Sequence, residues 1–176
     1  MDKQEFSEFY DKYIDKVFRF VYLRVDSPET AQDLTSLVFL KFWQNQAPAV
    51  IKNKKIKQPP VISNPKAFLF QIARNQIIDF YRQKSKRHLS LENMGELADF
   101  QINQPTFSQK IELTLEMERI KKALQNIKPI YADIIIWRYV EDLSSKEIAQ
   151  ILNKKEGNVR VMLHRALESL RQQLTL

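Results

Sequence analysis

Residues 143–167 read LSSKEIAQILNKKEGNVRVMLHRAL, and their spacing predicts two short amphipathic helices separated by a tight turn. In the first half, Ile148 and Leu152 fall on one helical face behind several possible N-cap residues. In the second half, apolar residues recur at helical spacing from Val159 onward. Asn153 lies between the halves and tolerates the left-handed backbone conformation that such a turn needs. The pattern is typical of a helix-turn-helix.

The second predicted helix exposes side chains that could read base pairs. They are Asn158, Arg160, Val161, His164 and Arg165. In a helix-turn-helix the N-terminal part of the second helix enters the major groove, where arginine and amide groups pair with base edges. Arg138 and Lys146 are placed to contact phosphate, which positions a protein without specifying a sequence. The alternative is an αα-hairpin with a basic, solvated outer face, which the periodicity alone does not exclude.

Length and composition limit the classes of protein to which the chain can belong. The chain has 176 residues, enough for two small domains that each bury a core. It has no cysteine and two histidines, so we expect no disulfide, metal site or cofactor. Only two glycines, in a chain rich in helix formers, predict an all-α protein. No apolar run approaches the roughly 20 residues that cross a bilayer, so a cytoplasmic protein without membrane insertion is expected.

The net charge of +7 is unevenly distributed along the chain. Residues 41–87 hold eleven Lys and Arg against one Asp, and residues 154–176 hold five against two acidic residues. Residues 1–40 and 88–153 are each acidic overall. Two basic segments of this kind could face one long polyanion, although a solvated lysine-rich surface is the usual reason for such a run.

Two helices are predicted at the N-terminus. Apolar residues from Phe6 to Val21 form one wide stripe, which indicates a core helix. Ser27 then serves as an N-cap with Pro28 at the first helical position, and the second helix runs to about Trp43. This second helix carries more apolar surface than one partner helix would cover. Either it is sandwiched between helices or part of it is an external docking surface.

A second set of nucleic-acid contacts is predicted between residues 45 and 87. Residues 45–64 are predicted to form a loop, which carries Lys52, Lys54, Lys55 and Lys57. A helix restarts at Pro65 and has cations, amides and aromatic groups on its outer side. These are Arg74, Asn75, Tyr81, Arg82 and Lys84. Such groups can follow a phosphate backbone and meet unpaired bases; the alternative is an amphipathic helix with a frayed basic end.

The periodicity fails over residues 88–111, which are acidic and are predicted to link two domains. The domains are then residues 1–87 and residues 112–176. In the second domain, the nearly continuous apolar run of residues 130–140 is predicted to be the buried scaffold of the helix-turn-helix.

Three ordered segments resemble the extracytoplasmic-function (ECF) sigma factors of bacterial RNA polymerase. They read AQDLTSLVFLKFW (31–43), FLFQIARNQIIDFYR (68–82) and IYADIIIWRYVEDLSSKEIAQILNKKEGNVRVMLHRALESLR (130–171). The resemblance covers nearly the whole chain. It implies a transcription initiation factor, and not an enzyme, that binds core polymerase, directs it to promoters and assists melting.

The resemblance also assigns surfaces and partners. The first domain would bind the β′ clamp helices of the polymerase through Asp33, Leu34, Leu37, Phe39, Leu40 and Trp43. The following loop and helix would read the melted minus-10 element, and the second domain would read the duplex minus-35 element and meet the β flap. An anti-sigma factor is a further candidate partner. The protein is expected to act as a monomer, at the nucleoid when it is bound to polymerase.

The chain departs from the family pattern at a few positions. The family usually has an acidic residue at the position of Leu37 and a shorter loop than residues 45–64. It commonly has glycine at the position of Asn153, and serine or proline at that of Lys155. The alternative function is a stand-alone dimeric repressor, which would need a two-fold interface and a palindromic site. No paired carboxylates, Ser/His pair or metal-spaced ligands suggest an enzyme.

Overall fold

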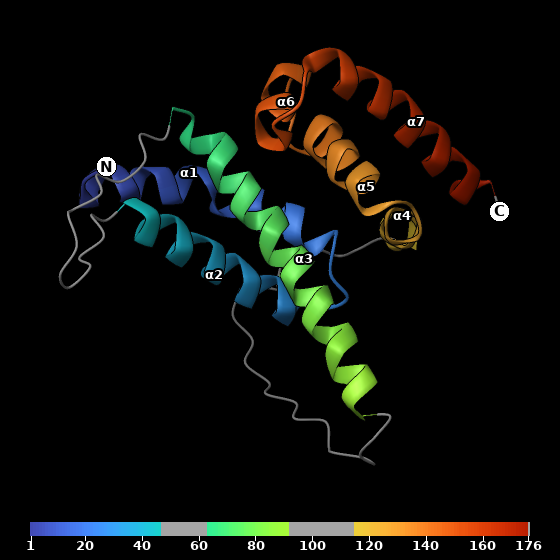
Figure 1. Ribbon diagram of the computed structural model, residues 1–176, viewed down its shortest axis with the longest axis horizontal. Helices are drawn as coiled ribbons and strands as arrows, with labels where there is room; N and C mark the ends of the chain where they lie inside the picture. Colours follow the sequence, from blue (N-terminus) through green and yellow to red (C-terminus); the bar gives the residue numbers. More distant parts are fainter. Residues whose placement is uncertain (47–62, 92–114, 176) are drawn as a thin grey trace.

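The computed structural model describes residues 1–46, 63–91 and 115–175, and within them it contains helices and no strand (Figure 1). The elements are α1 (Lys3–Tyr22), α2 (Pro28–Gln46), α3 (Pro65–Leu91), α4 (Leu115–Asn126), α5 (Pro129–Ile135), the π-helical segment η1 (Ile136–Val140), α6 (Ser145–Leu152) and α7 (Glu156–Leu174). We call α1–α3 the N-terminal half and α4–α7, with η1, the C-terminal half. The all-α prediction is confirmed.

The first two helices begin at the caps that their sequences provide. At the start of α1, Glu5 N donates to Asp2 Oδ1 at 2.8 Å and Asp2 N donates to Glu5 Oε2 at 2.8 Å, which is a capping box. At the start of α2, Thr30 N donates to Ser27 Oγ at 3.2 Å, and Pro28 is the first helical residue as predicted. The helix α2 ends at Gln46, slightly beyond the predicted end.

The helix α2 packs against both α1 and α3, so the first of the two alternatives, a helix sandwiched between helices, is confirmed. The Phe42 ring of α2 lies 4.9 Å from the Phe9 ring of α1 and 6.0 Å from the Phe68 ring of α3, between centroids. Even so, the Leu40 side chain on the remaining side of α2 is 51% exposed. The helix therefore has both a core role and an uncovered apolar side chain.

In the C-terminal half, α5 and η1 form the buried scaffold that the apolar run predicted. The side chains of Ile134, Ile136 and Trp137 are fully buried. The helix widens at η1, where Glu141 N donates to Ile136 O at 3.1 Å, a hydrogen bond across five residues. On this scaffold α6 and α7 pack, with α7 on the side away from the N-terminal half (Figure 1).

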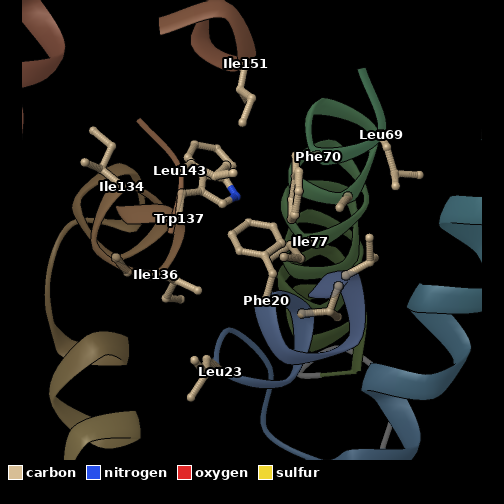
Figure 2. Close-up of a cluster of buried hydrophobic side chains, with 14 of the residues drawn as sticks. Phe20, Leu23, Leu69, Phe70, Ile77, Ile134, Ile136, Trp137, Leu143 and Ile151 are labelled. Atoms are coloured by element: carbon tan, nitrogen blue, oxygen red, sulfur yellow. The ribbon is translucent and has the colours of Figure 1, made fainter. Parts of the chain in front are cut away.

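The two halves share one hydrophobic core, which the prediction of two linked domains did not include. Figure 2 shows Trp137 of η1 facing Phe20 of α1 and Phe70 of α3, and the ring centroids are 5.1 Å and 6.4 Å apart. The α3 backbone stays helical to Leu91, beyond the predicted end of the first domain at residue 87. No proline or glycine occurs between Pro65 and Gly95 to stop the helix earlier. The domain boundaries themselves stay a prediction.

Candidate nucleic-acid and polymerase interfaces

The turn between α6 and α7 has the geometry of a helix-turn-helix. At the start of α6, Glu147 N donates to Ser144 Oγ at 3.2 Å and Ser144 N donates to Glu147 Oε2 at 2.8 Å, a second capping box. At its end, Asn153 takes the left-handed conformation with φ 50° and ψ 49°. Lys154 N donates to Ala149 O at 2.9 Å and closes the turn. Asparagine thus supplies the left-handed residue that the sequence predicted for this turn.

The helix α7 is held by its inner face and presents its outer face to solvent. Val159 and Ala166 are fully buried. All five side chains that were predicted to read bases are exposed, namely Asn158, Arg160, Val161, His164 and Arg165. Val161 is 52% exposed, which is a large exposure for an apolar side chain without a partner in the described part of the chain. The structure brings these side chains together on one helical surface.

Arg160 has an intramolecular partner that DNA could replace. Its guanidinium pairs with the Glu156 carboxylate one turn earlier, and the two side chains are 71% and 41% exposed. An exposed pair of this kind contributes about 0–1 kcal/mol, so a base edge can compete with it. At the same end of α7, Lys155 is the N-cap residue but caps no backbone N–H with its side chain. The N-terminus of α7 is therefore open to an anion such as phosphate.

The two predicted phosphate contacts of this half differ in their surroundings. Arg138 is partly buried, and its Nη1 donates to Leu143 O at 3.0 Å, which fixes the loop before α6. Lys146 is exposed on α6. Lys146 is therefore better placed than Arg138 to contact a phosphate. The hydrogen bond from Arg138 to Leu143 O is a structural role that the sequence did not indicate.

The predicted nucleic-acid residues on α3 fall into two groups. Asn75 and Arg82 are exposed, and among the described residues Arg82 pairs with Asp79 of its own helix alone, at 2.9 Å. Arg74, Tyr81 and Lys84 instead hold other parts of the protein. Their partners are Asp133 Oδ2 at 3.1 Å from Arg74 Nε, Arg24 O at 2.8 Å from Tyr81 Oη, and Asp26 Oδ2 at 2.7 Å from Lys84 Nζ. The loop residues Lys52, Lys54, Lys55 and Lys57 lie outside the described residues.

The prediction that Arg74 stays on the outside is wrong for this packing. Helical periodicity placed Arg74 on the polar side of α3, but that side meets α5 and not solvent alone. The side chain is 29% exposed and pairs with a buried carboxylate. Tyr81 is also partly buried, and burial raises the pKa of its hydroxyl.

The predicted polymerase-docking residues on α2 also separate by exposure. Asp33 and Leu40 are exposed, and Leu37 and Trp43 are partly exposed. Leu34 and Phe39 are only 8% and 3% exposed, which contradicts their assignment to a docking surface. The Phe39 ring packs 4.7 Å from the Tyr10 ring of α1, because α2 is covered on two sides. These two side chains stabilise the helix that carries the other four.

Three carboxylates of the C-terminal half, none of them predicted as functional, bind cations of the N-terminal half. Asp133 Oδ1 accepts from Arg24 Nε at 2.9 Å, and its Oδ2 accepts from Arg74 Nε. Glu141 accepts two hydrogen bonds of 3.0 Å from Arg19. Glu147 pairs with Lys66 at 2.6 Å. These ion pairs join the halves around their shared apolar core.

The pKa values of these carboxyl groups respond to burial and to the paired cations. Burial raises the pKa of Asp133, and the guanidinium groups of Arg24 and Arg74 act in the opposite direction. Burial likewise raises the pKa of Glu141, although the hydrogen bond and the charge of Arg19 act to lower it. Glu147 is less buried, and the hydrogen bond from Lys66 and then that from Ser144 N lower its pKa to about 2.

The sequence contained a sign that Asp133 forms an ion pair. Asp133 is the one acidic residue within the apolar run of residues 130–140. A carboxylate on a buried helix is costly unless cations pair with it, so it indicates an ion pair with another element. The sequence did not say which element supplies the cations.

In the described part of the chain, His, Cys, Asp and Glu side chains form no group of three or more that could hold a metal ion. None of the described helices combines the length and the apolar character needed to cross a membrane.

The chain is similar in sequence to known transcription proteins. The family model described as sigma-70, region 4, matches residues 117–170, which include the helix-turn-helix. The ECF RNA polymerase sigma factor BldN of Streptomyces coelicolor is 27% identical over 165 residues, which are 94% of this chain and 58% of BldN. The RNA polymerase sigma factor SigV of Bacillus subtilis is 30% identical over 152 residues, which are 82% of this chain and 86% of SigV.

The fold is similar to that of a solved sigma factor. The structure of RpoE from Bartonella quintana, in complex with the anti-sigma factor NepR, matches with a TM-score of 0.65 and 22% identity. The match covers 98% of this chain and 98% of RpoE, so the likeness in fold extends over both halves.

Proposed function

The chain belongs to the extracytoplasmic-function (ECF) sigma factors of RNA polymerase, and we propose from this premise how its surfaces divide the work of initiation. It binds core RNA polymerase and directs it to promoters by recognising a minus-35 and a minus-10 element. The observation that carries this proposal is the set of five exposed side chains on α7, in a helix-turn-helix covered by the region 4 match. The similarities favour this role over a stand-alone repressor.

The C-terminal half reads the minus-35 element in duplex DNA. Arg160 and Arg165 can each form two hydrogen bonds with a guanine edge, Asn158 suits adenine, and Val161 suits a thymine methyl group. His164 lies on the same surface. Lys146 and the open N-terminus of α7 contact phosphate and set the position of the helix on the groove.

The N-terminal half holds the minus-10 element after strand separation. Asn75 and Arg82 are exposed on α3 and meet bases or phosphates of the separated strand, together with Lys52, Lys54, Lys55 and Lys57 of the segment predicted to be a loop. A base can stack and form hydrogen bonds at such a site only once it has left the duplex. Arg74, Tyr81 and Lys84 join this surface if their intramolecular bonds open.

The polymerase binds mainly on α2. Asp33, Leu37, Leu40 and Trp43 form the surface that meets the β′ clamp helices, and the C-terminal half meets the β flap. The protein acts as a monomer with the polymerase at the nucleoid, in the cytoplasm of a bacterium. An anti-sigma factor is a further candidate partner, as RpoE of Bartonella quintana was solved with one.

Transcription in a purified system tests this function. Core polymerase alone should start at scattered sites, whereas core polymerase with this protein should start at defined promoters that share two elements. Specific, dimeric binding of the isolated protein to a palindromic site, with no change in where the polymerase starts, would favour the repressor instead.

A further inference from the structure

One acidic side chain lies among the cations of the surface that faces the minus-35 element. Residues 153–165, which span the turn and the first part of α7, contain four Lys and Arg residues and a single acidic residue, Glu156. Glu156 is the first residue of α7. A carboxylate repels the phosphates of DNA, so its position on this surface lowers the attraction to any duplex, whatever its sequence.

The Glu156 carboxylate binds a side chain that faces the bases. Arg160 Nη2 donates to Glu156 Oε1, and the pair spans one turn of α7. The side chains of Arg160 and Glu156 are 71% and 41% exposed, so neither belongs to the core. A glutamate four residues before a basic residue is the favourable orientation of such a helical pair. Glu156 therefore restricts the direction of the Arg160 guanidinium before DNA is bound.

Arg160 can keep this partner while it binds a guanine. A guanidinium carries five N–H groups, and a guanine edge uses two of them through its O6 and N7 atoms. The Nη2 atom has two hydrogens, so one can donate to Glu156 Oε1 while the other donates to the guanine. The second arginine of this surface, Arg165, is exposed and has no ion pair within the described part of the chain.

The carboxylate distinguishes two kinds of acceptor that an arginine can bind. Arginine binds phosphate oxygens as well as guanine edges, and a phosphate contact carries no information about sequence. The Glu156 carboxylate beside the guanidinium repels a phosphate, which is an anion, much more than it repels a guanine edge, which is neutral. Specificity is a difference between two affinities, and this arrangement lowers the affinity for the unspecific contact.

We propose that Glu156 is a positioning residue that sets the sequence specificity of Arg160. In the complex with DNA, its carboxylate holds the Arg160 guanidinium at a guanine edge and keeps it away from the neighbouring phosphates. Glu156 itself contacts no base. This inference rests on the proposed function, because that function assigns α7 to the minus-35 element.

The experiment measures discrimination at each minus-35 base pair with core polymerase and the full chain. Competition binding compares one promoter with variants that each replace a single minus-35 base pair. Glu156→Gln removes the carboxylate charge and keeps the size of the side chain. Glu168→Gln is the matched control, because it makes the same change of charge about three turns later on α7. Glu168 is exposed and has no ion pair within the described residues. Circular dichroism checks that both variants keep their helical content.

The expected loss of discrimination is confined to one base pair, which Arg160→Ala identifies. There, Glu156→Gln should reduce discrimination about two- to fivefold relative to Glu168→Gln, which is the scale of an exposed ion pair. Glu156→Gln should also bind a promoter with a scrambled minus-35 element more tightly than Glu168→Gln does. Added to Arg160→Ala, it should change discrimination no further, because the two residues act through one contact.

Two results would overturn the inference. One is discrimination in Glu156→Gln equal to that in Glu168→Gln at the base pair that Arg160 reads. The other is a loss at a different base pair, or a loss that persists in the Arg160→Ala background, since Glu156 would then read a base directly, as a carboxylate can read cytosine. Failure of the unmodified protein to confer any discrimination at the minus-35 element would instead overturn the proposed function.

Discussion

Trp137 of η1 stacks on Phe20 of α1 with their ring centroids 5.1 Å apart, so the largest buried side chain of the C-terminal half is covered by the N-terminal half. Stacked aromatic pairs contribute beyond the area that they bury. Around this pair the ion pairs of Arg24 and Arg19 join the same two halves. The two halves of the free protein are therefore expected to unfold as one cooperative body.

Replacing Trp137 tests that cooperativity. We expect Trp137→Ala to lower the free energy of unfolding by about 3–5 kcal/mol, because a large core side chain leaves a cavity on both sides of the boundary. Trp43→Ala should cost less, since Trp43 is partly exposed. Urea unfolding followed by circular dichroism measures both. Equal effects of the two substitutions would show that the shared core contributes little to stability.

Glu147 provides a prediction for pH. Its pKa of about 2 is lowered first by the hydrogen bond from Lys66, so Lys66→Met should raise that pKa toward the ordinary value of 4.5. Because the pKa is depressed in the folded protein, the stabilisation from Glu147 is fully present above pH 4.5 and is lost as the pH falls toward 2. Carboxyl chemical shifts in an NMR titration measure the pKa. An unchanged value in Lys66→Met would mean that Lys66 does not reach Glu147 in solution.

The exposed side chain of Leu40 provides a test of polymerase docking. We expect Leu40→Glu to weaken binding to core polymerase several-fold while the helical content and the unfolding midpoint stay the same, because Leu40 is 51% exposed. Gln44→Glu adds the same charge to an exposed position one turn later and serves as the control. Leu34→Ala should instead lower stability, since Leu34 is buried. If Leu40→Glu binds as tightly as Gln44→Glu, the docking surface lies elsewhere.

The sequence predicted the parts of the fold that depend on local chemistry. The start of α2 at Pro28, the left-handed turn at Asn153 and the exposed face of α7 all follow from caps, turn residues and helical spacing. Each of these features is decided by side chains within a few residues of one another. Local patterns were therefore sufficient for the helix-turn-helix.

The contacts between the halves could not be predicted in the same way. Periodicity showed that Arg74 lies on a polar helical face, but not that Asp133 of another helix would meet that face. Likewise, Leu34 and Phe39 are apolar, and an apolar side chain suits either a core or a docking surface. They are buried because α1 and α3 pack around α2. Long-range packing decides such cases, because a helix pattern identifies a face and not its partner.

The most direct test of the central claim uses Arg160→Ala and Arg82→Ala with core polymerase on two forms of one promoter. One form is fully paired, and the other is melted in advance around the minus-10 element. Arg160→Ala should reduce transcription from both forms and lose about 1–3 kcal/mol of discrimination at one minus-35 base pair. Arg82→Ala should alter minus-10 preference and leave minus-35 preference unchanged. A change of minus-10 preference by Arg160→Ala, or of minus-35 preference by Arg82→Ala, would contradict the assignment of the two halves to the two elements.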